Sequence, residues 1–141
     1  MNRTALHILI AEDEISHSMA MRRMLEKTCP DARVEVVTSL KDYRNSIAVA
    51  TPTVALLDLN LMDGCIMDLL TAPGGTPPFP FIVMSSSASK QVALDALNAG
   101  AMDFIIKSPD VFMSIAEIVK KTVREWDLRM EKNSGVVTLA F

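Results

Sequence analysis

The sequence predicts an α/β protein built on one parallel β-sheet with helices on both faces. Five short apolar runs recur along the 141 residues, and segments with helical spacing separate them. Three of the runs are apolar at successive positions, which is typical of strands covered on both faces. Short connections and right-handed crossovers then favour a single doubly covered sheet. The predicted strands are 6–11, 33–37, 53–58, 79–85 and 102–107.

Length and composition narrow the class of protein. The length suits one domain with a single core. Half of the residues are apolar, 22% are charged and the net charge is −3, so a nucleic-acid-binding role, which needs a basic surface, is not indicated. Cys29 and Cys65 are too few and too far apart for a disulfide framework or a zinc site. The sequence has no signal-peptide or membrane-helix pattern, so we expect a cytoplasmic protein.

The helices follow from apolar spacing and from residues that cap helix ends. The first helix is expected over 15–28, and the more polar, alternating strand before the second helix, 33–37, suits a sheet edge. Ser39 and Asp42 form a capping-box pattern that opens a helix running to about residue 50. A short third helix is expected over 65–72, with Asp63 as its cap and without a catalytic role.

Two further helices complete the pattern. Ser89 is the expected N-cap of the fourth helix, and Gly100 its stop. Ser108 and Pro109 open the last helix, which we expect to run unbroken to about residue 133. We therefore predict one domain over 1–133 and a β-prone tail over 134–141. The sequence leaves open whether that tail is a docked strand, a disordered end or the start of a missing downstream segment.

Polar residues gather at the carboxyl ends of the predicted strands, where α/β sheets bind their ligands. Glu12 and Asp13 follow the first strand, Asp58 ends the third, Ser85 ends the fourth and Lys107 ends the fifth. Two like charges about 4 Å apart repel by roughly 4 kcal/mol at an effective dielectric of 20. Three carboxylates at one edge must therefore raise a pKa or hold a cation, and Lys107 offsets only one charge.

This set of groups is suited to phosphoryl transfer. A hard divalent ion such as Mg²⁺ takes carboxylate, carbonyl and water oxygens as ligands. A carboxylate beside such an ion, with a lysine and a hydroxyl group nearby, can act as a nucleophile toward phosphorus. We expect Asp58 to be that nucleophile, because a buried strand holds it rigidly.

Four stretches, in this order and spacing, resemble the receiver domain of two-component response regulators. They are "ILIAEDE", "VALLDLNLMDG", "FIVMSSSAS" and "NAGAMDFIIKSP", and the resemblance covers about residues 5–126. It implies a flavodoxin-like (βα)5 fold with strand order 2-1-3-4-5. It also implies a phosphorylatable signalling module, as in the chemotaxis regulator. Such a module is not a conventional enzyme, although it catalyses its own Mg²⁺-dependent phosphorylation and a weak autodephosphorylation.

The resemblance implies a role for each site residue. Asp58 would accept the phosphoryl group from a sensor histidine kinase or a phosphotransfer protein. Asp13, Asp58 and the backbone carbonyl of Asn60 would bind Mg²⁺, and Glu12 would act partly through water. Ser85 and Lys107 would contact the phosphoryl group.

The resemblance also implies a switch. Ser85 and Phe104 would reshape the surface formed by the fourth helix, the fifth strand and the last helix. That surface would recruit an output partner that the sequence does not identify, or a second copy of the chain. No membrane or nucleic-acid partner is expected.

Departures from the family pattern and rival functions complete the expectations. Ser108 separates Lys107 from the proline that usually follows the lysine directly, and a trans Lys107–Ser108 bond would shift Lys107. One alternative is a docking scaffold with idle phosphorylation. A haloacid-dehalogenase-like phosphatase would need an acid where Asn60 stands, and a flavodoxin would need a phosphate loop where "AEDEIS" stands. We expect His17 to be an exposed helix residue.

Overall fold

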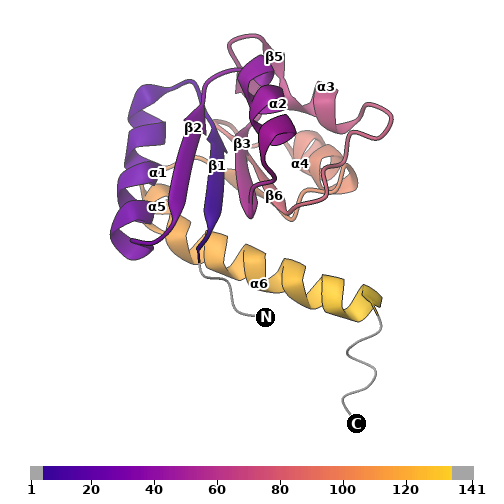
Figure 1. The fold of residues 1–141 in the computed structure, drawn as a ribbon. Helices are drawn as coiled ribbons and strands as arrows, with labels where there is room; N and C mark the ends of the chain where they lie inside the picture. Colours follow the sequence, from indigo (N-terminus) through magenta and orange to yellow (C-terminus); the bar gives the residue numbers. More distant parts are fainter. Residues whose placement is uncertain (1–4, 135–141) are drawn as a thin grey trace.

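A five-stranded parallel sheet forms the centre of the molecule. The computed structural model describes residues 5–134. The strands lie in the order β2-β1-β3-β6-β7 (Figure 1). Counted along the chain within this sheet, the order is 2-1-3-4-5, so the predicted fold class and strand order are confirmed. The strand bounds are β1 His7–Ala11, β2 Arg33–Val37, β3 Val54–Asp58, β6 Phe81–Ser85 and β7 Asp103–Ile106.

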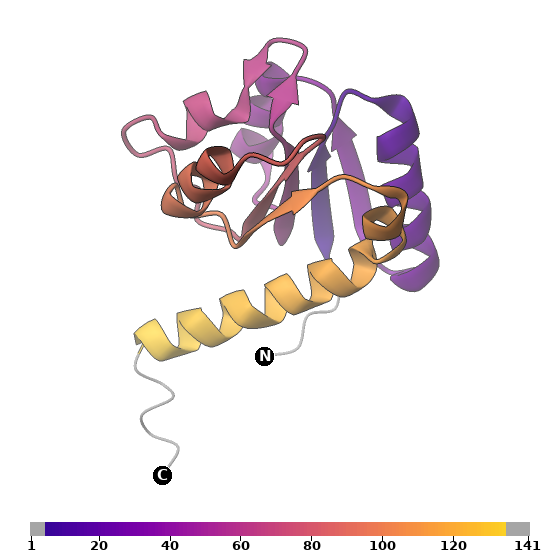
Figure 2. The ribbon, with the colours of Figure 1, turned by 180° about the vertical axis from the view of Figure 1, so that it is seen from behind.

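Helices cover both faces of this sheet (Figures 1 and 2). The helices are α1 Ile15–Thr28, α2 Leu40–Val49, α3 Ile66–Leu70, α4 Lys90–Asn98, α5 Pro109–Met113 and α6 Ile115–Ser134. One face packs against α1, α5 and α6, and the other packs against α2, α3 and α4. The C-terminal part of α6 extends past the strands in both views. Within residues 5–134, no helix combines the length and the apolar character that crossing a bilayer requires.

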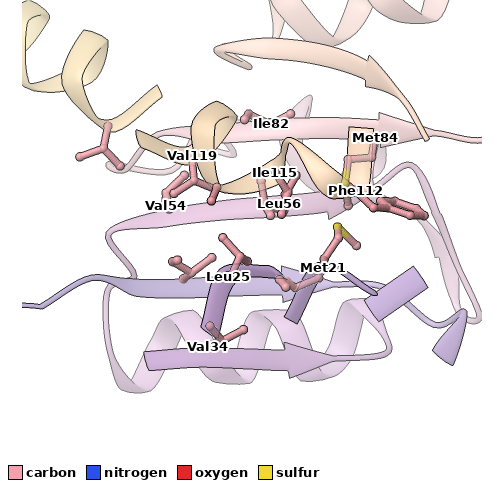
Figure 3. Packing of buried hydrophobic residues seen from close by; sticks show 14 residues of the cluster. Met21, Leu25, Val34, Val54, Leu56, Ile82, Met84, Phe112, Ile115 and Val119 are labelled. Atoms are coloured by element: carbon pink, nitrogen blue, oxygen red, sulfur yellow. The ribbon is translucent and has the colours of Figure 1, made fainter. Parts of the chain in front are cut away.

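Alternating residues of each strand supply the two halves of the core, because successive side chains in a strand point to opposite faces. Leu56 and its neighbours pack against α1, α5 and α6, as Figure 3 shows. Leu57, the next residue, belongs to the cluster that also contains Tyr43 of α2 and Ala96 of α4. The central strand β3 is buried along its whole length. This rigid double packing fixes the position of its last residue, Asp58.

The predicted helix caps are present. The Oγ atom of Ser39 accepts a hydrogen bond from the backbone N–H of Asp42 at 3.0 Å. Ser89 and Ser108 accept equivalent bonds at 3.3 Å and 3.1 Å. Gly100 has φ +105°, a conformation that glycine adopts without the steric cost of a side chain. Local sequence therefore determines where these helices begin and end.

The last helix differs from the prediction, because it is two helices that meet at Ser114. The backbone N–H of Ser114 bonds the carbonyl groups of both Asp110 and Val111, at 3.1 Å and 3.0 Å. Both α5 and α6 contact α1, and α6 continues along the sheet beyond α5. The division into a domain over 1–133 and a tail over 134–141 stays a prediction, since 135–141 lie outside the described residues.

A small hairpin follows β3 and was not predicted. Its strands, β4 Asn60–Leu61 and β5 Gly64–Cys65, pair in antiparallel fashion. The turn presents Asp63, whose carboxylate accepts hydrogen bonds from the backbone N–H groups of Leu40 at 2.7 Å and Lys41 at 3.1 Å. Asp63 therefore caps α2, and the prediction that it caps the third helix was wrong. The reason is long-range: the hairpin folds back over a helix that is distant in sequence.

Candidate functional site

Three carboxylates meet at the carboxyl edge of the sheet. Glu12 and Asp13 directly follow β1, and Asp58 is the last residue of β3. One carboxylate oxygen of each lies within 4.8 Å of the others. Glu12 has no exposed surface, Asp58 is 6% exposed, and Asp13 is half-buried. The neighbouring strands β1 and β3 bring together acids that are far apart in the chain.

Lys107 directly follows the edge strand β7, and its side chain reaches this acidic cluster. Its Nζ atom lies 2.9 Å from Oε1 of Glu12 and 3.3 Å from Oδ1 of Asp58. The lysine side chain is 5% exposed, so both ion pairs are buried. The backbone N–H of Lys107 bonds the carbonyl of Ser85 at 2.8 Å, at the end of the β6–β7 pairing. The residues described contain no cis peptide bond, so Lys107 reaches both acids with a trans Lys107–Ser108 bond.

The charges in this cluster do not balance. Burial and the neighbouring Glu12 carboxylate together raise the pKa of Asp58 to about 7, and Lys107 offsets only part of their effect. Burial alone would lower the pKa of Lys107, but Glu12 and Asp58 outweigh it, and the net direction is upward. Three acids and one lysine leave surplus negative charge among oxygen ligands. This set of donors fits a hard divalent cation.

A small pocket opens beside the cluster. Its volume is about 220 Å³, and its lining includes Asp13, Asp58, Asn60, Ser85 and Lys107. The Ser85 hydroxyl group donates to the Ser87 carbonyl at 3.0 Å and accepts from the Ser87 N–H at 3.3 Å. In this structure the hydroxyl group is therefore engaged by its own loop.

Phe104 lies apart from this pocket. It is half-buried on β7 and packs against the core cluster that includes Ala96 and Ala101. All the other residues that the sequence nominated lie in or beside the pocket.

His17 lies on helix α1, as predicted, but it is half-buried, so the predicted exposure was wrong. Only 33% of its side chain is exposed, and its ring lies 5.1 Å from that of Phe112, measured between centroids. It lines the pocket, and its Nδ1 atom lies 3.8 Å from Oε1 of Glu12. The position of His17 in the sequence could have indicated this location. A helix that begins at residue 15, just after a strand end, keeps its first turn beside that strand end.

The chain is similar to known proteins over most of its length. The family model of the response regulator receiver domain matches residues 8–121 of the chain. The methanogenesis regulatory protein FilR1 of Methanothrix harundinacea is 30% identical over 128 residues, which cover 86% of this chain and 28% of that protein. A protein-glutamate methylesterase/protein-glutamine glutaminase of Archaeoglobus fulgidus is 29% identical, over 95% of this chain and 39% of that protein. The chain thus spans less than half the length of these two relatives.

Solved structures share the fold. A CheY-like response regulator receiver domain protein from Methanospirillum hungatei JF-1 matches with a TM-score of 0.76 and 24% identity, over 89% of this chain and 99% of that one. The Mn²⁺-bound form of response regulator Rcp1 matches with a TM-score of 0.69 and 18% identity, over 80% of this chain and 91% of that one. At these identities the likeness concerns the fold.

Proposed function

The chain belongs to the response regulator receiver domain family, and on that premise we propose that Asp58 is its phosphoacceptor residue. Receiver domains are phosphorylated by histidine kinases or phosphotransfer proteins and act on output domains. The observation that carries the assignment to Asp58 is its position: it ends the buried central strand, within the acidic cluster and 3.3 Å from Lys107.

In the proposed reaction a carboxylate oxygen of Asp58 attacks the phosphorus atom of a phosphohistidine. A P–O bond forms as the P–N bond breaks, and the imidazole of the donor keeps the electron pair and takes up a proton. The product is an acyl phosphate. Lys107 neutralises charge on the transferred group, and the Ser85 hydroxyl group donates a hydrogen bond to one of its oxygens. Both residues line the pocket beside Asp58, which supports these roles.

Receiver domains bind a divalent metal in their acidic pocket, and we propose that the ion here is Mg²⁺. Asp13, Asp58 and the backbone carbonyl of Asn60 would hold it, with Glu12 contributing through water. The surplus negative charge of the cluster and its oxygen-only donors support this assignment. When bound, the ion neutralises charge on the carboxylates and on the transferring phosphoryl group.

The proposed switch connects Ser85 to the surface of α4, β7 and α6. Ser85 would exchange its bonds with Ser87 for a bond to the phosphoryl group, and Phe104 would turn inward. Leu94 and Leu97 of α4 and Ile106 of β7 are 47%, 46% and 37% exposed, so apolar side chains are available there for an output partner or a second copy. We also propose a cytoplasmic location, which suits the free thiols of Cys29 and Cys65.

Intact mass tests the phosphoacceptor assignment. The full chain is incubated with Mg²⁺ and acetyl phosphate, beside an Asp58→Asn variant. A single labile phosphate adduct on the wild type alone supports the proposal. Equal labelling of the variant moves the acceptor to another residue, and absence of labelling favours a docking scaffold. Continuous release of phosphate from many esters would favour a phosphatase, which Asn60 already disfavours because that class needs an acid at its position.

A further inference from the structure

His17 has a buried nitrogen atom without a partner, and the proposed phosphorylation reaction does not use it. Among residues 5–134, Nδ1 of His17 is the buried side-chain nitrogen or oxygen atom that makes no hydrogen bond. Such an atom is costly to keep, so it usually serves a state other than the one observed, or binds something from solvent. Its ring packs on one side against that of Phe112 of α5.

The unpartnered atom faces an oxygen that already has a donor. Nδ1 of His17 lies 3.8 Å from Oε1 of Glu12, the same atom that accepts from Nζ of Lys107 at 2.9 Å. The other oxygen of Glu12 accepts from the backbone N–H of Glu14 at 3.1 Å. A shift of about 1 Å would bring Nδ1 within hydrogen-bond range of Oε1. In the tautomer that carries a proton on Nδ1, His17 is therefore a second donor for this oxygen, just beyond hydrogen-bond range.

A phosphoryl group on Asp58 would change this competition. The phosphoryl group carries about 1.5 to 2 negative charges, and because the acyl bond removes the carboxylate charge of Asp58, the net gain next to Lys107 is at most about one charge. The lysine, 3.3 Å from Oδ1 of Asp58, is then drawn toward the phosphoryl oxygens and away from Glu12. Glu12 has no exposed surface, so this movement of the lysine would take the charged donor away from a buried carboxylate oxygen.

We infer that His17 is a positioning residue that donates from Nδ1–H to Oε1 of Glu12 when Lys107 turns to the phosphoryl group on Asp58. This inference rests on the proposed function, since it needs a phosphoryl group on Asp58. The ring has space to shift, because a second cavity of about 480 Å³ lies between α1 and α5, lined by His17, Ala20, Phe112 and Met113. The exchange keeps Glu12 paired in both states.

Binding of beryllofluoride, a stable mimic of the phosphoryl group, tests the exchange without a kinase. The full chain is titrated with beryllofluoride in saturating Mg²⁺ by calorimetry, beside His17→Phe, His17→Asn and a Ser16→Ala control on the same helix. Phenylalanine keeps the packing on Phe112 but has no donor, so we expect beryllofluoride to bind about 5 to 10 times more weakly. Asparagine places an N–H donor near the position of Nδ1 and should restore at least half of the loss.

Two further measurements separate this role from a structural one. The melting temperature without ligand and the affinity for Mg²⁺ alone should stay unchanged or improve in His17→Phe, because the unpaired atom is removed. In ¹⁵N spectra of the wild-type imidazole, Nδ1 should carry a proton protected from exchange only after beryllofluoride binds.

Each contrary outcome has its own meaning. Equal binding by the wild type, His17→Phe and His17→Asn, or an Nδ1 signal that beryllofluoride leaves unchanged, overturns the exchange and leaves the phosphoacceptor assignment intact. Loss of melting temperature in step with loss of binding overturns it in favour of plain packing. Failure of the wild type itself to bind beryllofluoride overturns the phosphoacceptor assignment and this inference together.

Discussion

The surroundings of Asp58 disfavour the ionised form of its carboxyl group. Burial and Glu12 raise its pKa to about 7, and a single lysine serves both acids. This arrangement is unfavourable in the absence of a cation and favourable with one. The same residues that make the site reactive therefore lower the stability of the protein when no cation is bound, which is common at functional sites.

Replacing Asp58 should reveal that cost. At pH 7.5 with a chelator present, Asp58→Asn should be more stable than the wild type by about 1 kcal/mol, because one of three clustered negative charges is gone. Mg²⁺ should then raise the melting temperature of the wild type and leave that of the variant nearly unchanged. Thermal unfolding with and without Mg²⁺ measures both effects.

Asp68→Asn on α3 is the matched control, since it removes the same charge from an exposed position. If Asp58→Asn and Asp68→Asn shift the melting temperature equally, the effect is one of net charge, and the clustered repulsion is refuted.

Side-chain hydrogen bonds also join helices and strands that are distant in the sequence. Glu35 of β2 is bonded by Nε2 of His7 on β1 at 2.9 Å and by Oγ of Ser46 on α2 at 2.8 Å. Burial alone would raise the pKa of Glu35, but the bonds from Ser46 and His7 and the charges of His7 and Arg33 lower it overall. The edge strand β2 is thereby joined to its neighbours at a site away from the acidic cluster.

This network should make the free energy of unfolding depend on pH. A carboxyl group whose pKa is lowered by folding stabilises the fold above its ordinary pKa, and that contribution is lost as the pH falls. Glu35→Gln should therefore cost about 1 kcal/mol at pH 7, and the difference from the wild type should shrink toward pH 3. Urea unfolding across this range measures it. A pH-independent difference would contradict the linkage, and Asp31→Asn, in the exposed loop before β2, is the control.

The side-chain hydrogen bond that caps α2 leads to a second prediction about single helices and strands. Ser39→Ala removes the side-chain acceptor for the backbone N–H of Asp42 and should lower the free energy of unfolding by about 1 kcal/mol. Ser39→Asn keeps an acceptor at that position and should cost less. Urea unfolding at pH 7 compares the two, and an equal loss in both variants would show that the hydroxyl group acts through packing.

The whole molecule holds the site through its two cores. β3 separates them, with Leu56 facing α1, α5 and α6 and Leu57 facing α2, α3 and α4. Asp58 is the next residue, so any loosening of this strand moves the carboxylate against Lys107. Stability and site geometry are coupled in this way across the fold.

Leu56→Ala tests the coupling. A cavity in a fully buried position should cost about 3 kcal/mol of unfolding free energy. Labelling by acetyl phosphate should slow as well, because Asp58 is less firmly held. Val49→Ala, at an 88% exposed position, is the control for removal of apolar volume. A stable fold with slow labelling, or an unstable fold with normal labelling, would separate the two properties and contradict the coupling.

The sequence by itself determined the five strands of the central sheet, the caps at Ser39, Ser89 and Ser108, and the set of strand-end residues at one edge. These follow from local periodicity, from cap chemistry and from the rule that parallel strands end together. Only the tertiary structure decided three other features. They are the bonds of Lys107 to both Glu12 and Asp58, the cap that Asp63 places on α2, and the unpartnered nitrogen of His17. Each of these depends on which side chains meet across the sheet after folding. Patterns of neighbouring residues do not carry that information, because Lys107 and Glu12 are 95 residues apart.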